Sequence, residues 1–438
     1  MKKSPLLTFI AFICGVANCF ASITVQVSTD RKDALYREND EITFTITARD
    51  GEKQLDWGKI HWTLSLDGHE TLDQGERSLD GEKYVVVKGK LNQPGFLLVK
   101  ATFEGPDEKK VTAYGGAGVS PTKIPMSLPV PEDFDEFWLA QKAQLAKSPA
   151  TFTAEPVVLP DADHGIEAVD INIQCETDGP PVSGYFAKPR DAAPKSLPAV
   201  LWVHGAGVRS SSLPTATHGA RMGFLSMDIN AHGIPNGQSA EFYKELAAGA
   251  LRTYRHDGRE SRDSIYFRGM IVRLIRAIDF LTSRPEWDGT VMAVVGHSQG
   301  GLQALAAGGV DERVTFIASG VPAGCDHSGM KANRISGWPK IVPLLENGQP
   351  EPAALEASRY IDAVNFATRC KADAILSVGF IDRTCPPTSV YAAFNALPGP
   401  KRMINEPKMG HTSGPIRERF QQALEAHVAE KKGAAVQQ

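Results

Sequence analysis

The chain of 438 residues has little of three features that would place it in other classes of protein. It has no basic excess, since its formal net charge is −4, so nothing favours nucleic acid or an anionic membrane as a partner. Beyond its first segment, no apolar run is long enough to cross a bilayer. Six cysteines are too few for a disulfide scaffold at this length. The remaining composition, 42% hydrophobic and 22% charged, is that of a globular protein with two or three domains.

The first segment has the pattern of a secretory signal peptide. Two lysines precede an apolar run at Leu6–Val16, and Cys19–Ala21 offers small residues before a cleavage point at Ser22. We therefore expect residues 1–21 to be removed and the protein to be exported to the periplasm or the extracellular space. Lipid attachment at Cys19 is the second interpretation, which the preceding asparagine disfavours.

Four cysteines lie beyond that segment, at Cys175, Cys325, Cys370 and Cys385. A single bridge between Cys370 and Cys385 is one interpretation, and buried free thiols are the other. The sequence contains neither a CxxC nor an HExxH pair, so it gives little support for a zinc site. We expect no metal and no cofactor.

Residues 22–119 have the pattern of an all-β domain. Five stretches alternate polar and apolar residues or are rich in β-branched ones, with Asp-Gly turns between some of them: Ile23–Val27, Ile42–Ile46, Ile60–Leu66, Tyr84–Val87 and Gly95–Phe103. Short strands at this spacing predict a β-sandwich of immunoglobulin-like architecture. Trp57 and Trp62 fit either a carbohydrate-binding face or a packed core, and sandwiches more often bury their aromatic residues.

The rest of the chain changes to an α/β pattern. Glycines and prolines between residues 115 and 131 indicate a boundary, and we place a linker at 120–133. From 134 to 438, apolar strands alternate with helical stretches, among them Phe134–Ala146, Arg268–Ser283 and Pro415–Lys431. This alternation predicts a doubly wound, mostly parallel sheet with helices on both faces.

A Gly-x-Ser-x-Gly motif at Gly296–Gly300 follows an apolar strand at Val291–Val295 and precedes a helical stretch of small residues. This is the pattern of a nucleophile elbow, a turn so tight that small residues must stand two positions before and after the serine. The turn raises the hydroxyl above the sheet at a helix N-terminus. Chance matches to the motif are common, but here the flanking elements agree with it. We predict that Ser298 is a nucleophile in an α/β-hydrolase fold.

A serine hydroxyl needs a base, and the base needs a carboxylate that orients it. In the α/β-hydrolase fold these follow the serine in the order acid, then histidine, on loops after late strands. Asp382 follows an apolar strand at Ile375–Val378, and His411 stands just before the final helix. Alone, each would be read as a turn or structural residue. Their order and placement predict the triad of Ser298, Asp382 and His411.

The expected oxyanion hole combines two backbone N–H groups. One belongs to Gln299, directly after the nucleophile, and the other to Ala206, in a glycine-rich loop after an early strand. His232, His327 and Trp338 are candidates for the substrate pocket. The alternative is that the two histidines are satisfied loop residues and that the tryptophan closes a loop. The charged segment Glu241–Phe267 is long for a connection and is expected to form a lid.

Several further motifs resemble the acetyl xylan esterases and cephalosporin C deacetylases. The likeness covers roughly residues 129–431 and includes the Ser-Gln-Gly-Gly form of the elbow at 298–301. It also includes short stretches at Phe134–Trp138, Arg268-Gly269, Arg276-Ala277, Pro285–Asp288 and Asp311–Val314. This family usually carries a tyrosine where Ala206 stands and an Arg-Gly-Gln turn where Asn230–Gly233 stands; in the family both positions flank the acyl pocket, so a strict preference for acetyl groups and the family's oligomeric state do not follow from the resemblance.

The resemblance implies hydrolysis of small acyl esters, chiefly acetyl, on decorated sugars. It maps the nucleophile, acid and base onto Ser298, Asp382 and His411, and the oxyanion donors onto Ala206 and Gln299. A feruloyl-type esterase or a serine peptidase of the same fold remains an alternative. So does a glycan-binding protein with a decayed catalytic domain, against which the complete triad argues. The sequence leaves the glycan, the acyl group and the oligomeric state open.

Overall fold

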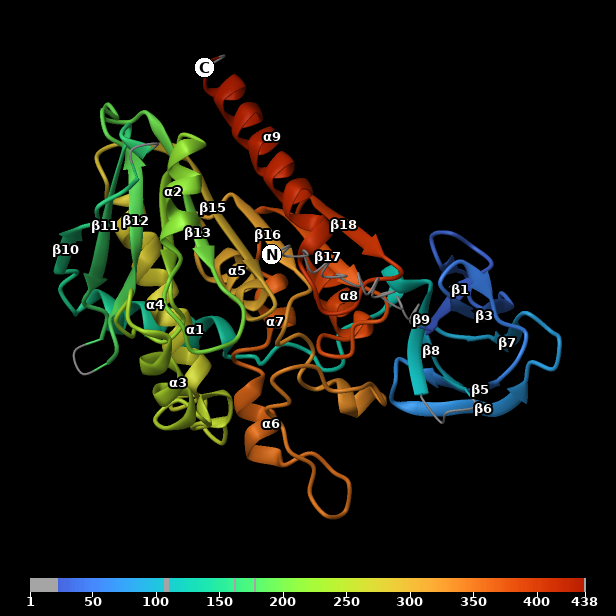
Figure 1. The fold of residues 1–438 in the computed structure, drawn as a ribbon. Coiled ribbons are helices and arrows are strands. Elements are labelled where there is room, and N and C mark those ends of the chain that lie inside the picture. The colour runs from blue at the N-terminus through green and yellow to red at the C-terminus, as the bar shows by residue number, and fades with distance from the viewer. Residues whose placement is uncertain (1–22, 106–109, 161–162, 177–178, 437–438) are drawn as a thin grey trace, which may run out of the picture.

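The computed structural model describes residues 23–105, 110–160, 163–176 and 179–436 (Figure 1). The expected signal peptide at 1–21 lies outside these residues. Among the helices of the described residues, none is both long enough and apolar enough to cross a membrane.

The described residues between 23 and 119 form two β-sheets around one apolar core. One sheet joins β1 to β3 and β3 to both β4 and β7, and the other has the order β2-β9-β8-β5-β6. Phe44 on β3 and Val99 on β8 are both fully buried in the core that the two sheets share. The strands are β1 Ile23–Thr29, β2 Leu35–Tyr36, β3 Ile42–Asp50, β4 Lys53–Gln54, β5 Lys59–Leu66, β6 Glu70–Ser78, β7 Val85–Gly89, β8 Gly95–Glu104 and β9 Lys110–Val119. The segment is thus all-β, and an immunoglobulin-like topology stays a prediction.

Four of these strands were not expected from the sequence: the two-residue strands β2 and β4, and the long strands β6 and β9. β6 is exposed along nearly its whole length and lacks an apolar face, so only its pairing with β5 identifies it. The glycine-rich stretch at 115–119 is the second half of β9, paired along its length with β8. Gly116 is required there because a Cβ atom would lie 2.3 Å from the carbonyl oxygen of Phe380. The glycines therefore mark a close approach between layers of the molecule.

The second part of the chain is built on a nine-stranded sheet, with the order β10-β11-β12-β14-β13-β15-β16-β17-β18. The six strands from β14 to β18 are parallel, and β10, β11 and β12 extend the sheet antiparallel at one edge. The predicted α/β class with a mostly parallel sheet is confirmed. The bounds are β10 Phe152–Pro156, β11 Ile166–Ile173, β12 Val182–Pro189, β13 Leu197–Val203, β14 Leu225–Ile229, β15 Trp287–His297, β16 Phe316–Gly320, β17 Asp373–Gly379 and β18 Lys401–Glu406.

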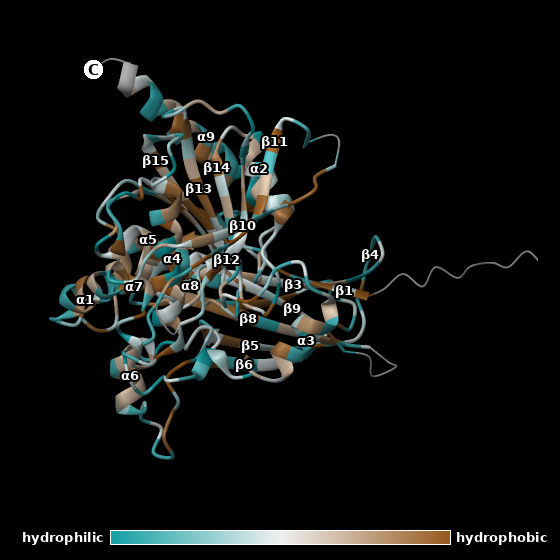
Figure 2. Cartoon of the chain, turned by 90° about the vertical axis from the view of Figure 1, so that its left-hand side faces the viewer, coloured by the Kyte–Doolittle hydropathy of each residue, from teal (hydrophilic) through white to brown (hydrophobic). Residues whose placement is uncertain are grey.

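Helices cover both faces of this sheet, and hydrophobic residues concentrate on its strands (Figures 1 and 2). One face carries α1 Phe134–Ala146, α4 Tyr266–Thr282, α5 Gln299–Val310, α7 Ala363–Ala367 and α8 Pro387–Ala396, and the other carries α2 Leu213–Arg221 and α9 Arg417–Val436. The connections hold α3 Ala240–Ala248, α6 Pro352–Ser358 and the 3-10 turns η1 Pro121–Lys123, η3 Tyr254–His256, η4 Gly329–Ala332 and η5 Gly414–Ile416. α9 begins two residues later than predicted because η5 precedes it.

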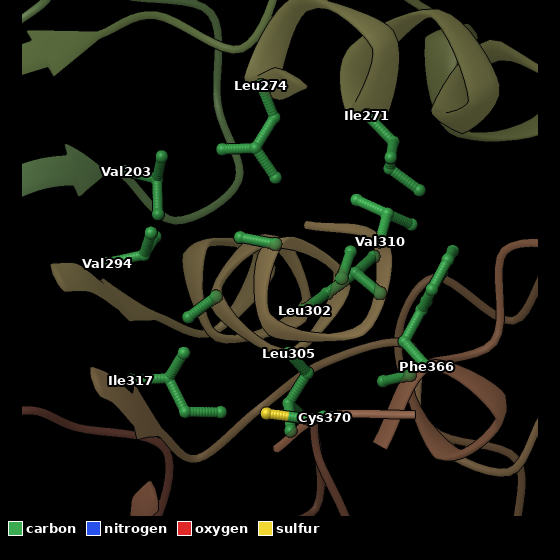
Figure 3. Close-up of a cluster of buried hydrophobic side chains, with 14 of the residues drawn as sticks. Val203, Ile271, Leu274, Val294, Leu302, Leu305, Val310, Ile317, Phe366 and Cys370 are labelled. Atoms are coloured by element: carbon green, nitrogen blue, oxygen red, sulfur yellow. The ribbon is translucent and has the colours of Figure 1, made fainter. Parts of the chain in front are cut away.

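Helix α5 is surrounded by protein. Figure 3 shows it viewed along its axis, with strand side chains such as Val203 on one side and Leu274 of α4 on another. Leu302 and Leu305 on α5 are at most 1% exposed. Because this helix directly follows Ser298, its burial fixes the position of the elbow.

The cysteines of the described residues are free thiols, and all are buried. The bridge between Cys370 and Cys385 is therefore wrong, and the free-thiol interpretation holds. Cys370 precedes β17 and Cys385 follows it, so the length of a seven-residue strand separates them. A strand of that length spans about 20 Å, far beyond the reach of a disulfide.

Candidate active site

The serine of the elbow stands between β15 and α5 in a strained backbone conformation. Ser298 has φ 59° and ψ −118°, a region that non-glycine residues rarely adopt. The turn is tight because its flanking glycines contact backbone: a Cβ on Gly296 would lie 2.2 Å from the Gly300 carbonyl oxygen. A Cβ on Gly300 would lie 2.1 Å from the Val203 carbonyl oxygen. Both positions therefore require glycine, as the motif predicted.

The three predicted triad residues lie within hydrogen-bonding distance of one another. Oγ of Ser298 is 2.9 Å from Nε2 of His411, and Nδ1 of His411 is 2.8 Å from Oδ2 of Asp382. A carboxylate only accepts, so Nδ1 carries the proton and Nε2 is left to accept from the serine hydroxyl. Asp382 is 3% exposed and Ser298 8%, whereas the His411 side chain is 26% exposed. This is the arrangement that lets a histidine deprotonate a serine.

Backbone N–H groups of its own loop hold the carboxylate of Asp382 in place. Oδ1 accepts hydrogen bonds from the backbone N–H groups of Thr384 and Cys385, at 2.8 and 2.9 Å. These two bonds fix the plane of the carboxylate and leave Oδ2 directed at the imidazole of His411. The loop thus sets which oxygen meets the histidine.

The two segments expected to supply the oxyanion donors, the N-terminus of α5 and the loop of Ala206, both adjoin the serine. Gln299 is the first residue of α5, so its N–H has no acceptor within the helix. The loop of Ala206 lies against the elbow, because a Cβ on the neighbouring Gly205 would be 3.5 Å from Cβ of Ser298. No acceptor among the described residues is recorded for the N–H of either Gln299 or Ala206. Both are free to bind a substrate oxygen.

Tyr254, in the segment predicted as a lid, contacts the side chain of Gln299, and no pattern in the sequence indicated this contact. Its hydroxyl donates to Oε1 of Gln299 at 3.0 Å, and Tyr254 is 7% exposed. Among the described residues, the amide Nε2 of Gln299 is buried without a partner, so the bond from Tyr254 is what anchors that side chain. Tyr254 therefore helps to fix the residue that follows the nucleophile.

The three pocket candidates are all packed into the protein. His232 is 2% exposed, and its ring nitrogens lie 2.6 Å from the Tyr266 hydroxyl and 3.2 Å from the Gly207 carbonyl oxygen. Through the bond to Gly207, His232 helps to hold the loop that carries Ala206 in place. His327 is 3% exposed, and burial lowers its pKa to about 4. Trp338 is partly buried against Phe267. Substrate contact by these three residues stays a prediction.

A second histidine lies beside the base. The rings of His297 and His411 are 6.2 Å apart, and the ring of His297 packs over Gly320. Burial, together with the nearby His411, lowers the pKa of His297 to about 4. His297 is therefore neutral near pH 7 and places no positive charge beside His411.

The side chains that could hold a metal coincide with the triad. In the part of the chain that the structure describes, the group of potential ligands is Asp382, Cys385 and His411, whose donor atoms lie within 4.8 Å of one another. Asp382 and His411 already bind each other. Burial raises the pKa of the Cys385 thiol well above its usual value, which disfavours the thiolate that a metal requires.

Two other features resemble sites but lie elsewhere. On α9, Nδ1 of His427 is 2.7 Å from Asp373 and Nε2 is 3.2 Å from the Thr315 hydroxyl, a geometry like that of the triad. His427 is 4% exposed and joins α9 to the opposite end of the strands from the elbow. A cavity of about 920 Å³ between α1 and the C-terminal end of α5 includes no triad residue in its lining.

Known proteins resemble this chain in sequence and in structure. The sequence model of the acetyl xylan esterase (AXE1) family matches residues 125–426. The acetyl esterase Axe7A of Xylanibacter ruminicola is 31% identical over 358 residues, which are 81% of this chain and 79% of that protein. Residues 125–438 are less than three quarters of the chain, so this second match also enters the N-terminal β domain.

Two solved structures agree with the sequence matches. An acetyl xylan esterase from Paenibacillus sp. R4 has a TM-score of 0.59 and 27% identity, covering 69% of this chain and 97% of that one. Acetyl Xylan Esterase 1 from Thermoanaerobacterium sp. JW/SL YS485 has a TM-score of 0.56 and 21% identity, covering 70% and 97%, and shares the fold. The chain belongs to the acetyl xylan esterase family, a family of carboxylic ester hydrolases.

Proposed function

We propose that this protein is an exported serine esterase that removes acetyl groups from decorated carbohydrate through an acyl-enzyme on Ser298. The observation that carries the mechanism is the hydrogen-bonded series from Ser298 through His411 to Asp382, with distances of 2.9 and 2.8 Å. The substrate class is supported by the family match over 125–426 and by the acetyl esterase relative.

In this mechanism, Nε2 of His411 takes the serine proton as Oγ of Ser298 attacks the ester carbonyl. Asp382 keeps the proton on Nδ1 and stabilises the imidazolium that forms. The N–H groups of Gln299 and Ala206 bind the oxyanion of the tetrahedral intermediate. As the bond between the acyl carbon and the sugar oxygen breaks, His411 gives its proton to that oxygen; the sugar leaves as an alcohol and an acetyl-serine remains. A water molecule, deprotonated by the same histidine, releases acetate and restores Ser298.

The experiment compares acetate release from acetylated xylan by the wild-type protein and by Ser298→Ala. We expect steady release by the wild type and a loss of several orders of magnitude in the variant, because it lacks the hydroxyl that His411 deprotonates. A wild type that is inactive on every acetylated sugar but active on feruloyl or peptide substrates would overturn the substrate class. Undiminished activity in Ser298→Ala would overturn the mechanism.

Export is proposed from the pattern at residues 1–21. The test is fractionation of cells that express the full chain, followed by determination of the mature N-terminus. A mature protein that begins at Ser22 outside the cytoplasm supports export by signal-peptide cleavage. A protein that retains Met1 in the cytoplasm contradicts it, and a lipid-modified Cys19 supports the lipoprotein alternative.

A further inference from the structure

The N-terminal β domain has no role in the mechanism above, yet it lies directly behind the loop of Asp382. In Figure 1, β8 and β9 form the side of that domain that faces α8 and β18. Phe96 on β8 belongs to the main apolar core of the α/β part. Its ring lies 5.1 Å from that of Phe380 and 5.7 Å from that of Tyr391. These two residues bracket the acid loop, since Phe380 precedes Asp382 and Tyr391 lies in α8.

A second contact joins the β domain to the residue next to the acid. Nη1 of Arg383 donates to the hydroxyl of Tyr114 on β9 at 2.8 Å, and the guanidinium lies 5.2 Å from the centre of that ring. The backbone of Gly116, two residues further along β9, approaches the Phe380 carbonyl so closely that no side chain fits. Backbone and side chains of β9 thus both touch the acid loop.

The third contact supplies a missing helix cap. α8 starts directly after the acid loop, with Pro386 at the cap position and Pro387 next, so no side chain of its own caps it. The N–H of Thr388 is one of the orphan donors of this helix N-terminus. Oδ2 of Asp67 accepts it at 3.2 Å, from the turn between β5 and β6. A carboxylate is the preferred partner at this end of a helix.

The turn that carries Asp67 is itself held in place. Asp67 has φ +50°, a left-handed conformation, and its N–H donates to the Phe96 carbonyl oxygen at 2.8 Å. Burial is the main cause that raises the pKa of Asp67 to about 7; the Thr388 hydrogen bonds and Arg334 oppose the increase, and Asp382 adds to it. An ionisable group in an apolar interface is costly unless it makes a specific bond. Here the bond is the cap of α8.

We propose that the N-terminal β domain is a structural part of the active site and that Asp67 is the positioning residue through which it holds the loop of Asp382. By capping α8, Asp67 fixes the far end of the loop, while β17 fixes the near end. Oδ2 of Asp382 then stays directed at His411. The domain is therefore inseparable from catalysis, unlike a binding module that could be removed. This inference rests on the proposed triad mechanism.

The test measures kcat and KM on 4-nitrophenyl acetate for the full chain carrying Asp67→Ala or Asp67→Asn. Asn keeps an acceptor oxygen for Thr388, so we expect Asp67→Asn to stay within about threefold of wild-type kcat. Asp67→Ala leaves the N–H without a partner, and we expect kcat to fall at least tenfold with KM within twofold. Rescue by Asn, together with loss in kcat alone, distinguishes positioning from general damage.

Two control variants separate this effect from loss of stability. Asp73→Ala makes the same change at an exposed site on β6 and is expected to leave kcat unchanged. Val87→Ala removes two methyl groups from the core of the β domain, away from the interface, and is expected to lower the unfolding temperature more than kcat. Wild-type kcat in Asp67→Ala would overturn the proposal. So would a kcat loss no larger than that of Val87→Ala at an equal fall in unfolding temperature.

The outcome is separable from that of the proposed function. If the wild type cleaves 4-nitrophenyl acetate but no acetylated sugar, the substrate class fails while the test of Asp67 stands. If the wild type cleaves no ester, the rate at which a fluorophosphonate labels Ser298 replaces kcat as the readout. We then expect labelling of Asp67→Ala to be at least tenfold slower than wild type. An unchanged labelling rate would overturn the role of Asp67.

Discussion

Replacing Asp382 by asparagine should abolish most activity while the loop keeps its shape. Oδ1 of Asp382 accepts two backbone bonds, from Thr384 and Cys385, and only an oxygen can do so. In Asp382→Asn the amide oxygen must occupy that position, so the amide NH₂ faces Nδ1 of His411. An NH₂ group donates, so Nδ1 must accept and the ring proton moves to Nε2. His411 then presents a proton to Ser298 where it should present a lone pair.

The expected magnitude follows from this reversal. A histidine in the wrong tautomer cannot act as the base, and the comparable change in another serine hydrolase lowers kcat by about 10⁴-fold. By the rate law this corresponds to about 5.4 kcal/mol of transition-state stabilisation. Because the two backbone bonds are kept, the unfolding temperature should change little.

The assay is acetate release from acetylated xylan and from 4-nitrophenyl acetate, with thermal unfolding measured in parallel. Asp373→Asn is the matched control, since Asp373 makes the same kind of bond to His427 outside the site. We expect its kcat to stay near wild type. A kcat for Asp382→Asn above about one tenth of wild type, in a folded protein, would refute the reasoning about the tautomer.

Three more predictions address the hole, the elbow and the sheet. Tyr254→Phe should lower kcat about tenfold with little change in KM, because the buried Oε1 of Gln299 loses its donor; steady-state kinetics decide this. Gly300→Ala should leave no measurable esterase activity and a lower unfolding temperature, because the added Cβ meets the Val203 carbonyl oxygen; an active, stable variant would contradict the geometry. Burial raises the pKa of Asp228 to about 7, so above about pH 4 the folded state keeps a proton that the unfolded state loses. The free energy of unfolding therefore falls as the pH rises from about 4 to about 7. Asp228→Asn should therefore gain unfolding temperature relative to wild type between pH 5 and pH 8.5, and a constant difference would contradict the assignment.

The triad could be predicted from the sequence because each of its residues follows a recognisable strand. The Ser298 motif is local, and in a parallel sheet the ends of β15 and β17 meet at one edge. The order of the residues along the chain was then enough to predict that Asp382 and His411 lie near Ser298, without knowledge of how the side chains pack. The glycines at 296 and 300 were explained by the same turn geometry.

Other features could not be predicted because they depend on contacts distant in sequence. Tyr254 lies in a segment without periodicity, and its bond to Gln299 spans 45 residues. Asp67 stands in an ordinary Asp-Gly turn, where an aspartate needs no further explanation. Its bond to Thr388 spans 321 residues. Likewise β6 has no apolar face, so its sequence resembles a loop and only pairing with β5 makes it a strand.

The central claim is that Ser298 is acylated during turnover. It is tested most directly by acid-quenching the protein during hydrolysis of an acetyl ester and locating the acetyl group by peptide mass spectrometry. We predict a single acetyl group on the peptide that contains Ser298, lost on further incubation in water. The same peptide from Ser298→Ala should carry none. Turnover with no acetylated serine, or with the acetyl group on another residue, would contradict the mechanism.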